Sequence, residues 1–258
     1  RLRISPPRPD FALRVVPSRI NARARQFVPF TVFALRKDGF SGEIALSLKG
    51  IPGDFSLFGG MLPAGREKVR VTLLVPPVLP DERISLGVEG HAVIAGQEVV
   101  RTAVPADDMM QAFAYKHLGP AEDLEVDFRD WQKPPVSKAP ATHTPRPPYR
   151  SPIAILGDQP VKIPAGGTVE LRVTIPAREG EIQVELSDPP EGITIDSVSR
   201  FDEGAAISLR ADAEKAKPGL KGNLIANASQ QRTLTDKRSG KTREYRAVLG
   251  TLPAIPFK

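Results

Sequence analysis

The stretch Gly42–Leu57 reads GEIALSLKGIPGDFSL, and it recurs without gaps as GEIQVELSDPPEGITI over Gly180–Ile195. In both copies a Gly-Glu-Ile opening is followed by apolar residues at every second position and then by a cluster of proline and glycine. Alternation with period two predicts a strand with one buried face, because successive side chains of a strand point to opposite sides. The cluster predicts a turn before a second short strand. We therefore expect two copies of one β-unit.

Further alternating segments flank both copies. Each unit then has about seven short strands, which is the number in an immunoglobulin-like sandwich. There is no alternation of strands with helices, so parallel-sheet enzyme folds lose support. The predicted fold class is all-β, with two tandem immunoglobulin-like β-sandwiches. The matching segments are 28–34 with 169–175, 69–73 with 205–209, and 84–88 with 224–226.

The length of 258 residues suits two domains of ordinary size. Seven prolines lie between Pro134 and Pro152, and they predict an extended linker near the polyproline II conformation. We expect residues 1–10 to be the remnant of an upstream strand or linker. The first sandwich is then expected over 11–128, the proline-rich linker over 129–152 and the second sandwich over 153–258.

One segment has the signals of a helix. Asp107–Leu118 reads DDMMQAFAYKHL, with Asp107 placed to cap the first turn and Gly119-Pro120 placed to end the last. Its apolar positions are irregular, so a strand remains an alternative. We expect at most this one short helix in the chain.

The formal charge of +6 and the pI of about 9.6 invite a nucleic-acid partner. The excess, however, lies in residues 1–10 (+2) and 129–152 (+4), while 11–128 (−1) and 153–258 (+1) are nearly neutral. Aromatic residues are only 6% of the chain. A nucleic-acid surface concentrates charge on a domain and adds aromatic side chains for stacking, so we expect no nucleic acid. No apolar run has the length that insertion into a membrane requires.

Catalytic and metal-binding patterns are not evident. The three histidines His91, His117 and His143 have no metal-ligand spacing, and the chain has no cysteine. No Gly-x-Ser-x-Gly motif occurs, and Ser41 and Ser47 are interpreted as turn and strand residues. We expect no enzymatic activity, no metal and no cofactor.

Two groups of residues are candidates for ligand binding. Trp131 and Tyr149 of the linker can stack on a sugar ring, or they can anchor the linker on a domain. A basic cluster surrounds a predicted hairpin turn in the second unit, and it suits either a solvated tip or an anionic glycan. The cluster consists of Lys237, Arg238, Lys241, Arg243 and Arg246.

The repeat and its flanks also resemble a known family. DGFSGEIALSLKGIPGDFSL (38–57) with LPAGREKVRVTLLV (62–75), and KIPAGGTVELRVTI (162–175) with the second copy, are similar to bacterial immunoglobulin-like repeats of large exported proteins. Such repeats often follow pre-peptidase C-terminal domains. The resemblance implies a non-catalytic spacer or adhesion module outside the cytoplasm, with neighbouring domains of its parent chain as partners. Its motifs carry no catalytic residues.

Two alternative functions stay open. One is a carbohydrate-binding module for an anionic or cell-wall polysaccharide. The other is a set of accessory domains of an exported hydrolase. A sandwich supports all three roles, so the fold alone does not separate them.

Overall fold

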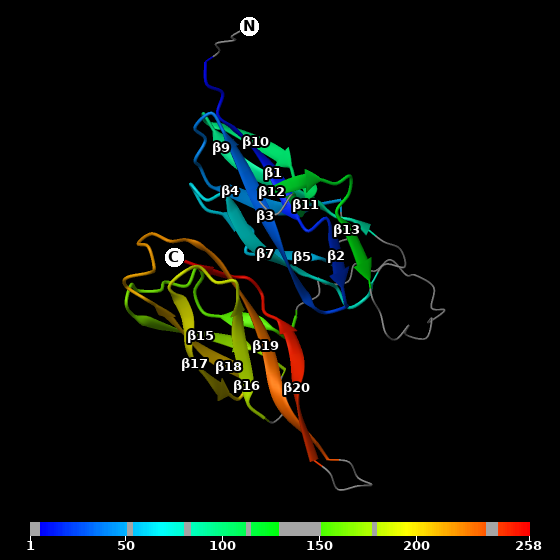
Figure 1. The fold of residues 1–258 in the computed structure, drawn as a ribbon, viewed down its shortest axis with the longest axis vertical. Coiled ribbons are helices and arrows are strands. Elements are labelled where there is room, and N and C mark those ends of the chain that lie inside the picture. The colour runs from blue at the N-terminus through cyan, green and yellow to red at the C-terminus, as the bar shows by residue number, and fades with distance from the viewer. Residues whose placement is uncertain are drawn as a thin grey trace, which may run out of the picture. The chain divides into compact units, whose positions relative to one another are not determined.

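The computed structural model describes residues 6–50, 54–79, 84–111, 115–128, 151–176, 180–235 and 242–258. These residues form strands, turns and loops without a helix (Figure 1). The described segments thus contain no helix with the length and apolarity needed to cross a membrane. The chain divides into two compact units, the first made of 1–68 and 73–150 and the second of 69–72 and 151–258.

The first unit has the strand order of an immunoglobulin-like sandwich. One sheet runs β12-β11-β1-β3-β7-β5 and another runs β10-β9-β4-β6. The inner order β1-β3-β7-β5 corresponds to A-B-E-D, and β4-β9-β10 corresponds to C-F-G. The strands are β1 (Asp10–Val16), β2 (Arg19–Ala22), β3 (Phe27–Lys37), β4 (Ile44–Lys49), β5 (Ser56–Phe58), β6 (Met61–Leu62), β7 (Lys68–Leu74), β8 (Ile84–Ser85), β9 (Gly87–Ile94), β10 (Gln97–Thr102), β11 (Val104–Gln111), β12 (Tyr115–Pro120) and β13 (Glu125–Phe128).

The second unit repeats this plan in a shorter form. Its sheets run β14-β15-β18-β17 and β16-β19-β20, which again correspond to A-B-E-D and C-F-G. The prediction of two immunoglobulin-like sandwiches is therefore confirmed. The strands are β14 (Ala154–Leu156), β15 (Thr168–Thr174), β16 (Ile182–Ser187), β17 (Ile193–Phe201), β18 (Gly204–Ala211), β19 (Gly222–Thr235), β20 (Thr242–Thr251) and β21 (Ile255–Phe257).

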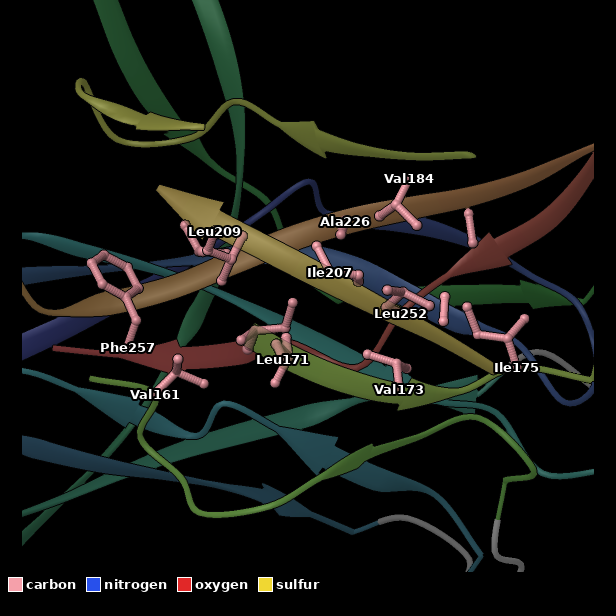
Figure 2. Packing of buried hydrophobic residues seen from close by; sticks show 14 of the residues in the cluster. Val161, Leu171, Val173, Ile175, Val184, Ile207, Leu209, Ala226, Leu252 and Phe257 are labelled. Carbon is pink, nitrogen blue, oxygen red and sulfur yellow. The ribbon is translucent and has the colours of Figure 1, made fainter. Parts of the chain in front are cut away.

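The alternating residues of the repeat form the cores. Ile44 and Leu46 are buried in the first unit, as Ile182 and Val184 are in the second. In the second unit the side chains of β15 and β18 meet those of β19 and β21 between the two sheets (Figure 2). Burial of these apolar side chains supplies the main favourable free energy of folding, about 1.5–3 kcal/mol for a fully buried valine or leucine. The labelled members in Figure 2 are Val161, Leu171, Val173, Ile175, Val184, Ile207, Leu209, Ala226, Leu252 and Phe257.

The repeated glycine at the start of each copy is held in the same way in both units. The Arg36 guanidinium donates hydrogen bonds to three loop carbonyls, the shortest at 2.6 Å to Gly42, and it lies over the Phe40 ring. In the second unit Arg200 donates to the carbonyl of Gly180 at 2.9 Å. A cationic donor thus satisfies the same carbonyl from two different strands.

Prolines divide the first strand of both sandwiches. β1 ends before Pro17 and continues as β2, which pairs in parallel with β13. In the second unit β14 ends before Pro160, and Val161 then bridges in parallel to Phe257. Proline has no N–H to donate to a ladder, so a strand breaks at this residue and the chain changes its partner sheet.

A hairpin is inserted into the last strand of the first unit. The Ala103 N–H donates to the Val88 carbonyl of β9 at 2.8 Å, and the N–H of Leu86, just before β9, donates to Leu124 at 2.9 Å. The chain therefore returns to the same partner segment after the interval 104–123. The corresponding interval in the second unit is only the short segment between β20 and β21. In the first unit it holds β11 and β12, and β11 joins β1 in parallel.

The predicted helix over Asp107–Leu118 is wrong for the described residues, and the strand alternative is right. Asp107 does not cap a helix; its carboxylate accepts hydrogen bonds from the backbone N–H and the hydroxyl of Ser18, at 3.2 and 2.8 Å. Antiparallel pairing of β11 with β12 satisfies backbone groups that a helix would have satisfied within each turn. The predicted linker lies, for residues 129–150, outside the described residues.

Candidate functional site

The solvent-facing side of the β10-β9-β4-β6 sheet carries a connected set of polar side chains. Leu46 of β4 and Ala92 of β9 are buried in the core. Side chains alternate along a strand, so the neighbouring residues Ser47 and His91 face away from the core. Glu98 of β10 lies on the same side, where it contacts His91. The set is therefore placed by three strands of one sheet.

The register of the strands brings Ser47 and His91 together. Ser47 lies opposite Glu89, and His91 lies opposite Ala45 on one side and Val100 on the other. Ser47 and His91 are therefore diagonal neighbours across an antiparallel pair, a separation that a histidine side chain can bridge. They are 44 residues apart in the sequence, and only the pairing of β4 with β9 makes them adjacent.

Ser47, His91 and Glu98 form a continuous hydrogen-bonded series. Ser47 Oγ lies 3.0 Å from His91 Nε2, and His91 Nδ1 lies 3.2 Å from Glu98 Oε1. An ionised carboxylate can only accept a hydrogen bond, so Nδ1 carries the proton in a neutral imidazole. Nε2 is then unprotonated and accepts from the Ser47 hydroxyl. Glu98 thus selects the tautomer in which His91 is a base toward Ser47.

Glu89 is an acid in the next row of the same face. It accepts hydrogen bonds from Lys49 Nζ and from the hydroxyl of Thr102. The hydrogen bond from Lys49 is the largest cause that lowers the pKa of the Glu89 carboxyl, and Thr102 and the charge of His91 lower that pKa further. Glu89 is therefore ionised at neutral pH and already has two hydrogen-bonding partners.

Exposed apolar side chains surround this series. One row of paired residues crosses the sheet, in the order Met61, Ala45, His91 and Val100. Met61 and Val100 are 45% and 41% exposed, and Val93, opposite Glu98, is 71% exposed. The face therefore combines hydrogen-bonding groups with uncovered apolar surface.

The backbone around Ser47 limits the chemistry of the series. Serine, histidine and carboxylate in this order are the groups of a nucleophile, its base and the acid that orients the base. The Leu46 N–H donates to the carbonyl of Gly60 on the β6 side, so the Ser47 N–H points the other way, toward β9. An oxyanion hole requires donors aimed at the reacting carbonyl, and this amide lies in the plane of the sheet instead.

Most of the predicted ligand-binding residues cannot be placed. Trp131, Tyr149, Lys237, Arg238 and Lys241 lie outside the described residues. Their role in binding stays a prediction.

The other two predicted residues lie on β20, which pairs with β19 past the end of β16 (Figure 1). Arg243 is opposite Leu234. Arg246 donates to the Ser229 hydroxyl at 2.7 Å and forms an ion pair with Glu185 at 2.9 Å. Its charge is therefore partly neutralised by its own sheet.

The histidines do not converge in the described part of the chain. His91 lies on β9 and His117 on β12, and His143 is outside the described residues. Within the described segments no three histidine, cysteine or acidic side chains gather as metal ligands. The interpretation of Ser47 as a strand residue is correct, but it missed the hydrogen bond with His91. Alternation predicted that Ser47 faces solvent, yet it contained no information on which strand lies beside it.

Comparison with known proteins gives no family for this chain. No protein-family model matches the sequence. No curated protein matches it either.

Two solved structures are similar to this chain at a low level. The D0-D1 domain of intimin is 10% identical, with 92% of this chain and 97% of that chain covered and a TM-score of 0.25. The D00-D0 domain of intimin is 9% identical, with 96% and 100% covered and a TM-score of 0.27. Similarity at this level assigns no function, so the site and its chemistry are argued from the residues alone.

Proposed function

We propose that the chain is a spacer and adhesion module of a larger protein outside the cytoplasm, and that the solvent-facing side of the β10-β9-β4-β6 sheet is its binding surface. The observation that carries the proposal is the row of exposed Met61 and Val100 beside the Ser47–His91–Glu98 series. Protein-binding surfaces combine uncovered apolar side chains with polar groups that fix orientation. The predicted partners include neighbouring domains of the parent chain.

The architecture supports a spacer role. Each unit has its own sandwich with the A-B-E-D and C-F-G order, and each buries its own set of alternating residues. Sandwiches of this kind hold their loops and faces at a defined distance, since strand ladders resist extension and bending. Binding outside the cytoplasm also suits a chain without cysteine, because it cannot form unwanted disulfides in an oxidising compartment.

An adhesion assay tests the binding surface. Beads coated with the chain are passed over immobilised bacterial cells, and the retained fraction is compared with that of albumin-coated beads. We expect the chain to increase retention of the beads. The double variant Val93→Glu, Val100→Glu should abolish this increase, because binding would then bury two carboxylates in an apolar contact. Val248→Glu is the matched control, since Val248 is an 81% exposed valine on β20 of the second unit.

Two results would refute this proposal. Retention equal to that of albumin would remove the adhesion role. An equal loss from the control variant would show that the effect of the added charge does not depend on the proposed surface.

An anionic polysaccharide remains the second candidate ligand. The observation that favours it is the extension of β19 and β20 beyond β16, which carries Arg232 and Arg243 next to the predicted basic turn. Binding to immobilised anionic polysaccharide that weakens steeply with added salt would support it, because such contacts are largely ionic. No retention at low salt would exclude it.

A further inference from the structure

The Ser47–His91–Glu98 series has a property that adhesion does not use. His91 Nε2 faces the Ser47 hydroxyl at 3.0 Å with its lone pair available, because the proton is on Nδ1 toward Glu98. A serine hydroxyl with such a base is a stronger nucleophile than an isolated serine. Ser47 and His91 are each only partly buried on an open sheet face, so small molecules can reach them.

We propose that Ser47 is a nucleophilic serine that accepts an acyl group from an uncharged, activated carboxylic ester. Ser47 Oγ attacks the carbonyl carbon while its proton passes to His91 Nε2. The tetrahedral intermediate then expels the alcohol or phenol, which takes this proton from His91, and an ester of Ser47 remains. The imidazolium is stabilised between these steps by the Glu98 carboxylate.

Hydrolysis of the acylated serine closes the sequence. A water molecule attacks the ester carbonyl and gives its proton to His91, and Ser47 leaves with that proton as the free hydroxyl. The net reaction is ester plus water to carboxylic acid plus alcohol, with no oxidant or further reactant. Both halves proceed slowly, since the Ser47 amide lies in the plane of the sheet and is not aimed at the reacting carbonyl.

The surroundings define the class of ester. Met61 and Val100 lie in the same row as His91, so an aryl leaving group or a short acyl chain has apolar surface to contact. Lys49 offsets the charge of Glu89, so the carboxylate of Glu98 leaves negative charge on this face, which repels anionic esters. The substrates are therefore neutral aryl or similarly activated esters of small acids.

The test uses the full chain and p-nitrophenyl acetate. Peptide mapping by mass spectrometry locates the acetyl groups, and treatment with alkaline hydroxylamine distinguishes serine esters, which it cleaves, from the amides formed on lysines such as Lys49. Ser18 is the matched control, because its hydroxyl bonds to the Asp107 carboxylate at 2.8 Å without an imidazole between them. We expect an ester-linked acetyl on Ser47 and a much smaller amount on Ser18.

Variants assign the roles. His91→Gln should lower the rate of Ser47 acetylation by about a hundredfold, the lower end of the range for general-base catalysis. Glu98→Gln should lower the rate of Ser47 acetylation, because an amide can donate to Nδ1 and no longer holds the proton on that nitrogen, and Glu98→Asp should restore part of the rate. Glu98 is thus a positioning residue. Lys49 and Glu89 stay unchanged in these variants, so their charges contribute equally to each rate.

The results separate reactivity from folding and from adhesion. The side chains of Ser47, His91 and Glu98 lie on the solvent side, and circular dichroism of each variant checks that the sandwich is intact. Equal acetylation of Ser47 and Ser18, or a rate unchanged by His91→Gln, would overturn the proposal. Bead retention and acetylation of Ser47 are independent measurements on the same unaltered chain, so failure of one proposal leaves the other standing.

Discussion

Replacing Gly90 by alanine adds one methyl group to the inner face of β9, and we expect it to destabilise the first unit. A Cβ at this position would lie 2.4 Å from Leu13 Cδ1, 2.8 Å from Ile44 Cγ2 and 3.3 Å from Phe11 Cε2. Carbon atoms in contact prefer about 3.5–4.0 Å. All three neighbours are 1% exposed or less, so they have little room to move away.

The magnitude follows from two opposing effects. Overpacking of a core by one methyl group costs about 1–3 kcal/mol. Loss of backbone freedom in the unfolded chain returns about 0.4–1 kcal/mol when glycine becomes alanine. We therefore expect Gly90→Ala to lower the free energy of unfolding by about 1–2 kcal/mol.

Gly222→Ala is the matched control. Gly222 also lies in a strand, but its Cβ would be 3.6 Å from the nearest Phe257 atom, an ordinary contact. This variant should be neutral or slightly stabilising. Hydrogen exchange of the full chain in increasing urea follows the unfolding of each unit through its own peptides. If Gly90→Ala were as stable as the unaltered chain, the packing of β9 against β1 described above would be wrong.

Three further perturbations test other parts of the structure. Arg36→Ala should lower the free energy of unfolding of the first unit by about 2–4 kcal/mol in urea, since three carbonyls lose a charged donor. Arg172→Ala should lower the free energy of unfolding by under about 1 kcal/mol, because its ion pair is exposed. Equal effects of the two variants would contradict this reasoning. Gly204→Ala should lower the free energy of unfolding of the second unit by about 3 kcal/mol, because the new Cβ would lie 2.0 Å from the Val173 backbone oxygen. If thermal unfolding showed this variant to be as stable as the unaltered chain, the pairing of β15 with β18 would be wrong. The pKa of the Asp10 carboxyl is lowered chiefly by its hydrogen bonds from Arg101, so its stabilising effect is complete above the unfolded carboxyl pKa of about 3.9 and is lost as pH falls through the folded value. Urea midpoints measured from pH 7 downward should therefore fall less steeply in Asp10→Asn, and identical slopes would show that this pair does not contribute.

Two local patterns made the strands and the repeat predictable. The alternation at Ile44 and Leu46, and at Ile182 and Val184, depends only on neighbouring side chains pointing to opposite faces. Prolines and glycines then marked the turns because their backbone restrictions are also local. The sandwich class followed from the number and spacing of these segments.

The segment Asp107–Leu118 shows where local reasoning stops. An acidic residue at its start and Gly119-Pro120 at its end are sound helix signals when the segment is considered alone. The segment instead folds back on itself, because β11 pairs with β12 from Asp107↔Gly119 to Gln111↔Tyr115. The carboxylate that would cap a helix is bound by Ser18, 89 residues earlier in the chain, and no pattern within the segment records that contact.

The sequence by itself determined that the chain has two β-units, where their core strands lie and that Ser47 faces away from the core. Only the tertiary structure decided that His91 lies beside Ser47 and that Glu98 lies beside His91. The physical reason is the register of the strands. β4 and β9 are paired by backbone hydrogen bonds, which are the same for every residue type. A shift of this pairing by two residues would therefore keep the same faces buried but would separate these three side chains. The contacts that set the register, among them the close fit of Gly90 against Leu13, come from the folded core.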